Sequence, residues 1–165
     1  EKFNTLLFTL QHIQQSKKQT KETIMISTFE RDLKVGKKYE DEVLKLIKNK
    51  YPKSYIVDGY YKEWDIYIPE LEIGIEVKSD KKSLDTGNIV IEIEFNNKPS
   101  ALSTSKAAWW VIYDGENYNW FTIKNIKKCI KENNLKYCSF IGKGDTKEKK
   151  AYLIKKEILY KYKTI

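Results

Sequence analysis

The chain is poor in several residue types on which common protein chemistries depend. Its 165 residues include one His and two Cys, with only 3 Pro and 7 Gly. His12 has no partner pattern, which argues against histidine-based catalysis, and Cys129 and Cys138 form no metal-like cluster. Free thiols in a Lys-rich domain are typical of a reducing compartment, so we expect a cytoplasmic protein. No segment approaches the roughly 18 apolar residues of a membrane span, so we expect no membrane partner.

Acidic residues are outnumbered by basic ones. The 31 Lys+Arg and 23 Asp+Glu residues leave a net charge of +8 and a pI near 9.2, which favours an anionic partner. All but one of the cations are Lys, the exception being Arg31, and Lys binds phosphate as a point charge rather than reading bases. Contact with a nucleic-acid backbone is therefore favoured. The abundance of Lys, Ile, Asn and Tyr expected from an AT-biased genome explains a basic surface about equally well.

The beginning of the chain differs from the rest. Residues 2–15 have the pattern of a short amphipathic helix, and a polar stretch over residues 16–23 follows. The apolar residues at helical spacing are Leu6, Leu7, Leu10 and Ile13. We therefore predict an N-terminal helical arm and linker over residues 1–26, ahead of a single domain over residues 27–165. The arm would either mediate a homodimer or fold back on its own core.

The remaining pattern predicts a mixed α/β domain. Ser27 and Glu30 form a capping-box pattern for a helix that ends near Tyr51-Pro52. Period-two alternation then predicts consecutive, antiparallel strands over residues 55–57, 64–68, 71–78 and 88–95. After them we expect a short helix over residues 100–108, a buried strand over 109–113, a paired strand over 120–123 and a Lys-faced helix from Ile123. Residues 142–165 give no clear pattern. The order predicts an α/β sandwich with a central mixed sheet.

Two acidic residues and a lysine are expected to meet on neighbouring strands. In the 71–78 strand, alternation puts Glu76 and Lys78 on one face. A hairpin would bring Asp65, in the middle of an apolar strand, beside Glu76. Two carboxylates on adjacent strands suit Mg²⁺, which takes one or two protein carboxylates and keeps several waters. Lys78 would orient or deprotonate one of those waters. The alternative is a solvated strand face whose ion pairs contribute little.

The preceding helix offers a third acidic residue. At 100° per residue, Glu40 falls inside the apolar arc of the helix, Glu42 lies just outside it and Asp41 faces solvent. A carboxylate among core-facing residues needs a partner or a metal. Glu40 is therefore a candidate for a further metal ligand.

These elements together carry a family resemblance. Gly36-Lys37-Lys38-Tyr39-Glu40, then Asp65, then Glu76-Val77-Lys78 resembles the PD-(D/E)xK nuclease superfamily of restriction-endonuclease-like and Holliday-junction-resolvase-like enzymes. Stretches between Gly87 and Trp110 also look like the small nucleases of this group found in phages. The likeness covers about residues 27–123.

The resemblance implies a restriction-endonuclease-like fold and a metal-dependent active site. Lys78 would serve the attacking water, and the cofactor would be Mg²⁺ or Mn²⁺. By this likeness the metal ligands would be Asp65, Glu76, the Val77 carbonyl and Glu40. Trp64 stands where the motif has proline, which is a departure from the pattern. A phage-encoded enzyme of this kind would act in the cytoplasm of the host cell.

Other residues are candidates for contact with nucleic acid. The segment from Ser100 to Lys106 offers hydroxyl groups and main-chain N–H groups, although helix capping explains them almost as well. The full set of candidate contacts is Lys62, Ser100, Ser103, Lys106, Lys124, Lys127 and Lys128. Glu92 and Glu94 share a polar strand face and either flank the acidic site or, for at least one of them, face solvent.

From these observations we expect a metal-dependent endonuclease that hydrolyses DNA phosphodiester bonds. DNA is favoured over RNA by the resemblance alone. A junction resolvase, a non-specific endonuclease and an exonuclease all fit the sequence. The competing hypothesis is a basic nucleic-acid-binding module that has a nuclease-like fold and does not cleave.

Overall fold

A computed structural model describes residues 33–59, 63–142 and 145–164 of the chain. The chain divides into two compact units, Glu1–Val35 and Gly36–Ile165. The predicted arm and linker over residues 1–26, with its dimerisation surface, lie outside the described residues, as does Lys62.

The described part of the first helix covers residues 33–48 and ends just before Tyr51, as predicted. The main-chain N–H groups of Lys50 and Tyr51 both donate to the carbonyl of Ile47, at 3.0 and 2.9 Å. Its buried residues, Tyr39, Val43 and Ile47, recur at intervals of four and define one face. This face packs on a sheet.

That sheet has five strands in the order β1-β2-β3-β6-β7. The strands are β1 (Tyr55–Ile56), β2 (Ile66–Ile68), β3 (Ile73–Ser79), β6 (Trp109–Tyr113) and β7 (Tyr118–Thr122). The first three are antiparallel, as expected, while β3 and β6 run parallel and β6 returns antiparallel into β7. The predicted mixed sheet within an α/β fold is therefore confirmed.

A second sheet corrects one prediction. The strand over 88–95, expected to continue the antiparallel series, does not pair with β3. It is β4 (Asn88–Phe95), which pairs with β5 (Lys98–Pro99) and β9 (Lys149–Lys155), and β9 also pairs with β8 (Cys138–Phe140). Instead, β6 pairs with β3. Three consecutive residues of β6, Trp110, Val111 and Ile112, are buried, which is typical of a strand covered on both faces inside a sheet.

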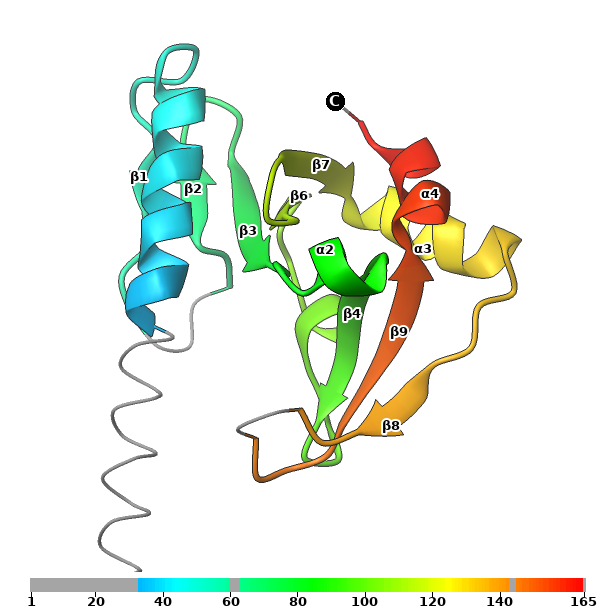
Figure 1. The fold of residues 1–165 in the computed structure, drawn as a ribbon. Helices are drawn as coiled ribbons and strands as arrows, with labels where there is room; N and C mark the ends of the chain where they lie inside the picture. The colour runs from blue at the N-terminus through cyan, green and yellow to red at the C-terminus, as the bar shows by residue number, and fades with distance from the viewer. Residues whose placement is uncertain (1–32, 60–62, 143–144, 165) are drawn as a thin grey trace, which may run out of the picture. The chain divides into compact units, whose positions relative to one another are not determined.

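Two apolar clusters hold these layers together. On one face of the first sheet, Ile66, Ile75 and Val111 pack against Val43 and Ile47 of the helix. The opposite face of that sheet packs on the second sheet and on α3 (Ile123–Glu132) and α4 (Lys156–Leu159). The members of this larger cluster include Trp110, Ile112, Phe121, Ile89, Ile91, Ile154, Ile126 and Leu159. Figure 1 shows β4 and β9 side by side, with α3 and α4 near the end of β9.

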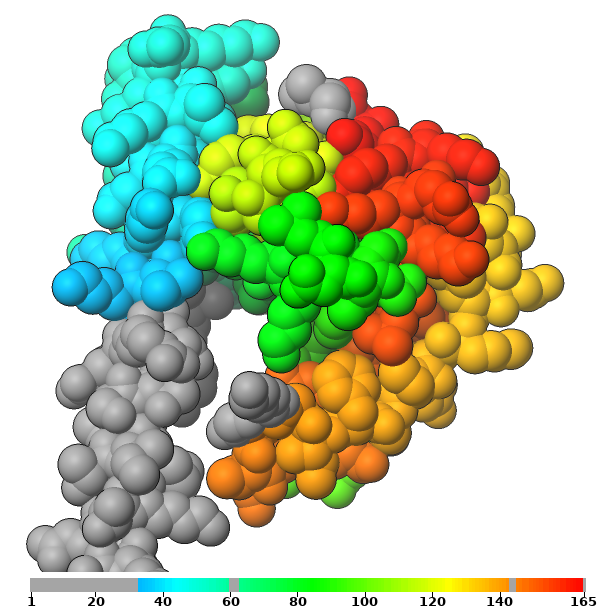
Figure 2. All heavy atoms as spheres, in the orientation of Figure 1, coloured from blue at the N-terminus to red at the C-terminus, as the bar shows by residue number. Residues whose placement is uncertain are grey.

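Several shorter elements complete the domain. The expected helix over residues 100–108 is only a 3₁₀ turn, η1 (Ala101–Ser103), and the expected turn after β3 contains the short helix α2 (Ser83–Thr86). The last short element, η2 (Tyr160–Tyr162), contacts α3. In Figure 2 the red atoms near the C-terminus lie next to yellow atoms from the region of α3. The Thr122 side chain caps α3 by accepting from the Asn125 N–H at 3.0 Å. None of the described helices is long and apolar enough to cross a membrane.

Candidate functional site

Asp65 is fixed at the point where the chain enters β2. Its N–H donates to the carbonyl of Ile75 at 2.9 Å, and its own carbonyl accepts from Val57 at 2.9 Å. The side chain is oriented as well, because Oδ2 accepts from the Val77 N–H at 2.7 Å. Asp65 is 8% exposed. Main chain and side chain together hold this carboxylate in one position beside β3.

Val77 presents its main chain to the same side of β3. Within an extended strand, the N–H and C=O of one residue point to the same neighbour. The Ile75 carbonyl accepts from Asp65 and the Val77 N–H donates to it, so residues 75 and 77 both face the β2 side. The Val77 carbonyl therefore lies on the side of the strand that Asp65 occupies.

The side chains of Glu76 and Lys78 lie together on the face of β3 opposite to those of Ile75 and Val77. Lys78 Nζ is 2.5 Å from Glu76 Oε1, and their side chains are 42% and 16% exposed. The Lys78 ammonium is also 5.8 Å from the ring centroid of Trp110. Burial lowers the pKa of Lys78, but the carboxylates of Glu76, Asp65 and Glu92 outweigh it, so the pKa is raised. Lys78 is therefore a cation and a hydrogen-bond donor at neutral pH.

A pocket of about 370 Å³ opens over this pair. The residues around it are Glu63, Glu76, Lys78, Glu92, Ala101, Thr104, Ser105 and Lys106. Three carboxylates and two ammonium groups therefore surround one space, and two of these residues, Lys106 and Glu63, form an ion pair. Thr104 belongs to the 100–106 segment whose hydroxyl groups were predicted to contact phosphate, whereas Glu63 was not predicted, although it lies only two residues before Asp65.

Glu92 and Glu94 were predicted to share a polar strand face, but the structure gives them different surroundings. Glu92 lines the pocket, with Ser100 Oγ donating to its Oε1 at 2.6 Å and Lys149 Nζ 3.6 Å from its Oε2. Glu94 instead forms an ion pair with Lys150 at 2.7 Å. The register of β4 on β9 shifts between Glu92 and Glu94, which is a β-bulge. Bulges re-aim side chains and are common near functional sites.

Glu40 comes from a different layer. It is half-buried on the helix whose Val43 and Ile47 pack against Ile75, and alternation along β3 puts Ile75 on the face opposite to Glu76. Glu40 is not among the residues that line the pocket. Its place in a metal site stays a prediction.

Trp64, the residue before Asp65, packs on the β2–β3 hairpin. Its ring stacks on Tyr67 with centroids 5.4 Å apart and covers Gly74, where an added Cβ would overlap the indole ring. Gly74 is thus required for close packing two residues before Glu76.

The predicted nucleic-acid contacts fall into two groups. Lys106 lines the acidic pocket, and the Ser100 hydroxyl donates a hydrogen bond to Glu92. Ser103 and Lys127 line a second pocket. Lys124 and Lys128 are exposed on α3, and Lys128 lies 3.8 Å from Glu132.

The donor chemistry of the site suits a hard cation. Within the described residues, no three His, Cys, Asp or Glu side chains are grouped so that they could hold a metal. Two carboxylates and a main-chain carbonyl are all oxygen donors, and Mg²⁺ needs no more than one or two carboxylates because it keeps water ligands. Asp65, Glu76 and Val77 are the residues that would hold it.

No protein-family model matches the chain, and no curated protein or solved structure matches it.

Proposed function

We propose that this protein is a Mg²⁺-dependent nuclease that hydrolyses phosphodiester bonds of DNA. The observation that carries the proposal is a group of three charged residues. The Val77 N–H holds the Asp65 carboxylate against β3 at 2.7 Å, while Glu76 and Lys78, whose Oε1 and Nζ atoms are 2.5 Å apart, line an open pocket. A structural role alone does not require two acidic residues and a lysine at the same end of two paired strands. The resemblance to PD-(D/E)xK nucleases supports the same reading.

The chain's own groups have distinct tasks in this reaction. The Val77 N–H holds the Asp65 carboxylate in place before substrate arrives, so no reorganisation is needed during the reaction. Lys78, kept protonated by its acidic neighbours, donates hydrogen bonds to the attacking water or to a phosphate oxygen and stabilises negative charge there. The bound metal would supply Lewis-acid polarisation of the phosphate and a more acidic water.

Charge supports a polyanionic substrate. The net charge of +8 attracts a phosphate backbone, and exposed lysines lie along α3. The acidic pocket would repel that backbone unless a cation neutralises it, which is the situation expected where metal and substrate phosphate meet.

The decisive experiment is incubation of the purified protein with end-labelled branched, duplex and single-stranded DNA, in Mg²⁺ and in EDTA. We expect cleavage of at least one substrate in Mg²⁺ alone, and loss of that cleavage in Lys78→Gln. Lys150→Gln is the matched control, because Lys150 forms a comparable ion pair with Glu94 at 2.7 Å but does not line the pocket. Salt-sensitive binding without cleavage of any substrate would instead favour the basic binding module.

A further inference from the structure

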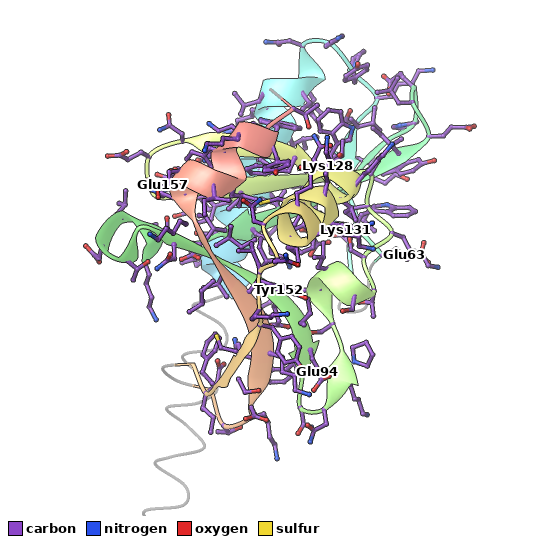
Figure 3. All side chains as sticks on the ribbon, turned by 90° about the vertical axis from the view of Figure 1, so that its right-hand side faces the viewer. Glu63, Glu94, Lys128, Lys131, Tyr152 and Glu157 are labelled. Atoms are coloured by element: carbon purple, nitrogen blue, oxygen red, sulfur yellow. The ribbon has the colours of Figure 1, made fainter. Side chains whose placement is uncertain are left out.

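A second pocket lies on the other side of the η1 turn from the acidic one. Its volume is about 380 Å³. It is lined by Ile93, Leu102, Ser103, Lys127, Ile130, Lys131 and Tyr152. These residues come from β4, η1, α3 and β9. In Figure 3, Lys131 on α3 and Tyr152 on β9 are labelled on this side of the molecule.

The chemistry of this second pocket is the reverse of the first. Among the described residues no carboxylate lines it, whereas three line the acidic pocket. Lys127 and Lys131 are exposed and stand four residues apart, so they share one face of α3. Within the part of the chain that the structure describes, neither forms an ion pair, while their neighbour Lys128 lies 3.8 Å from Glu132. Two positive charges are therefore available to an anionic ligand.

The inner wall of the pocket is apolar and aromatic. Ile93, Leu102 and Ile130 belong to or pack on the larger core cluster, which fixes their positions. Tyr152 is half-buried, and the exposed Tyr137 meets it edge to face with ring centroids 6.2 Å apart. A ligand that fits these walls has a flat apolar part and a negative part. A nucleotide has both, and base stacking on aromatic side chains with lysines along the backbone is how proteins hold single strands.

The position of the pocket relates it to the proposed active site. Ala101 and Thr104 line the acidic pocket, while the residues between them in sequence, Leu102 and Ser103, line the second one. A single 3₁₀ turn is therefore the wall between the two. A DNA strand that crosses η1 would place neighbouring nucleotides on its two sides.

We propose that the second pocket binds an unpaired nucleotide of the DNA strand next to the scissile phosphate. The base stacks on Tyr152, and Lys127, Lys131 and the Ser103 hydroxyl contact the adjoining phosphate. A base in a duplex is already stacked on both faces and cannot enter without unpairing. The inference rests on the proposed nuclease function, and it assigns to that function a preference for substrates with a single-stranded flank.

Binding measured without metal tests this site separately from cleavage. The probes are a fluorescent single-stranded oligothymidylate and a hairpin duplex of equal charge, titrated in EDTA and followed by anisotropy. We expect Tyr152→Leu to weaken single-strand binding about tenfold, because it removes the aromatic ring on which the base stacks. Duplex binding should be unchanged. Tyr152→Phe keeps the ring and should bind like wild type.

The control for a general loss of aromatic surface is Tyr55→Leu, at a 49% exposed tyrosine on β1 that does not line the pocket. Lys127→Gln removes one phosphate interaction and should lower the slope of log affinity against log salt for the single strand by about 0.7. Lys155→Gln, at a lysine on the same strand as Tyr152, should leave that slope unchanged. Thermal unfolding followed by circular dichroism shows that each variant is folded.

The outcomes separate the two proposals. Wild-type affinity of folded Tyr152→Leu for the single strand, or an equal loss for strand and duplex, would overturn the nucleotide pocket even if the protein cleaves DNA. A tenfold single-strand defect in a protein that never cleaves would keep the pocket and overturn the nuclease.

Discussion

Replacing Glu76 by glutamine separates the chemical role of this carboxylate from its structural one. Glu76→Gln keeps the size of the side chain and removes its charge, and with it a strong oxygen ligand and the ion partner of Lys78. If the carboxylate acts in catalysis, the cleavage rate should fall on the order of a hundredfold or more, as for the loss of other groups that stabilise charge in a transition state. Its effect on the free energy of unfolding should be small.

The small stability effect follows from the geometry of the ion pair. At 2.5 Å the attraction between Lys78 Nζ and Glu76 Oε1 would be several kcal/mol with an effective dielectric constant of about 20. The Lys78 side chain is 42% exposed, however, and solvent screening reduces such a pair to about 1 kcal/mol or less. The variant also leaves Lys78 near Asp65 and Glu92, which both raise its pKa. No buried charge is left uncompensated.

Two measurements on the same preparations check this prediction. Single-turnover cleavage of end-labelled DNA in Mg²⁺ gives the rate, and urea unfolding followed by circular dichroism gives the free energy. Glu94→Gln is the matched control, because its ion pair with Lys150 at 2.7 Å lies outside the pocket, and it should lose similar stability and no activity. Wild-type cleavage by folded Glu76→Gln would refute the assignment of this residue to catalysis.

Three further predictions concern the metal, the basic helix and a buried carboxylate. Mg²⁺ or Mn²⁺ should support cleavage and Ca²⁺ only binding, because Ca²⁺ accepts a looser oxygen shell; cleavage assays across the three ions check this, and full activity in EDTA would contradict it. Neutralising Lys124, Lys127 and Lys128 should weaken the salt dependence of duplex binding. In salt titrations, the slope of log affinity against log salt should fall by about one unit for each lysine that binds a phosphate. An unchanged slope would exclude α3 from the interface. Burial alone would raise the pKa of Asp114. Hydrogen bonds from Tyr160 and two main-chain N–H groups, together with the nearby Lys156 ammonium, outweigh this effect and hold the pKa well below its usual range. Its stabilisation is present at neutral pH and is lost as the pH falls below about 4, so Asp114→Asn should lose about 2 kcal/mol at pH 7 in urea unfolding and much less in acid; equal losses at both pH values would argue against the charge.

Alternation was sufficient to place the residues at the centre of the candidate site. The pairing of Ile66 with Ile75 puts Asp65 next to Glu76, because the apolar residues of both strands must face the helix that covers them. The same rule put Glu76 and Lys78 on one face. It worked because β2 and β3 are joined by a tight hairpin, so local sequence determined the partner as well as the face.

The partner of β4 could not be predicted in this way. Period two tells which face of a strand is buried and says nothing about which strand lies beside it. The true partner, β9, begins Lys149-Lys150 and ends with Lys155, so its apolar residues give no clean alternation. The register of β4 against β9 shifts between Glu92 and Glu94, and such a bulge cannot be predicted when the partner strand is unknown.

The departure of β4 from the first sheet accounts for the enclosure of the site. Had β4 continued beside β3, the face bearing Glu76 and Lys78 would lie open to solvent. Because β4 instead belongs to a second sheet packed on that face, Glu92 and residues at the η1 turn line the same pocket as Glu76. The β2–β3 hairpin thus supplies Asp65, Glu76 and Lys78, whereas β4 and η1 supply other residues that line the pocket. If the proposed nuclease function is correct, we expect substitutions at Asp65, Glu76 and Lys78 to lower the cleavage rate, and substitutions in η1 and β9 to change which DNA is bound.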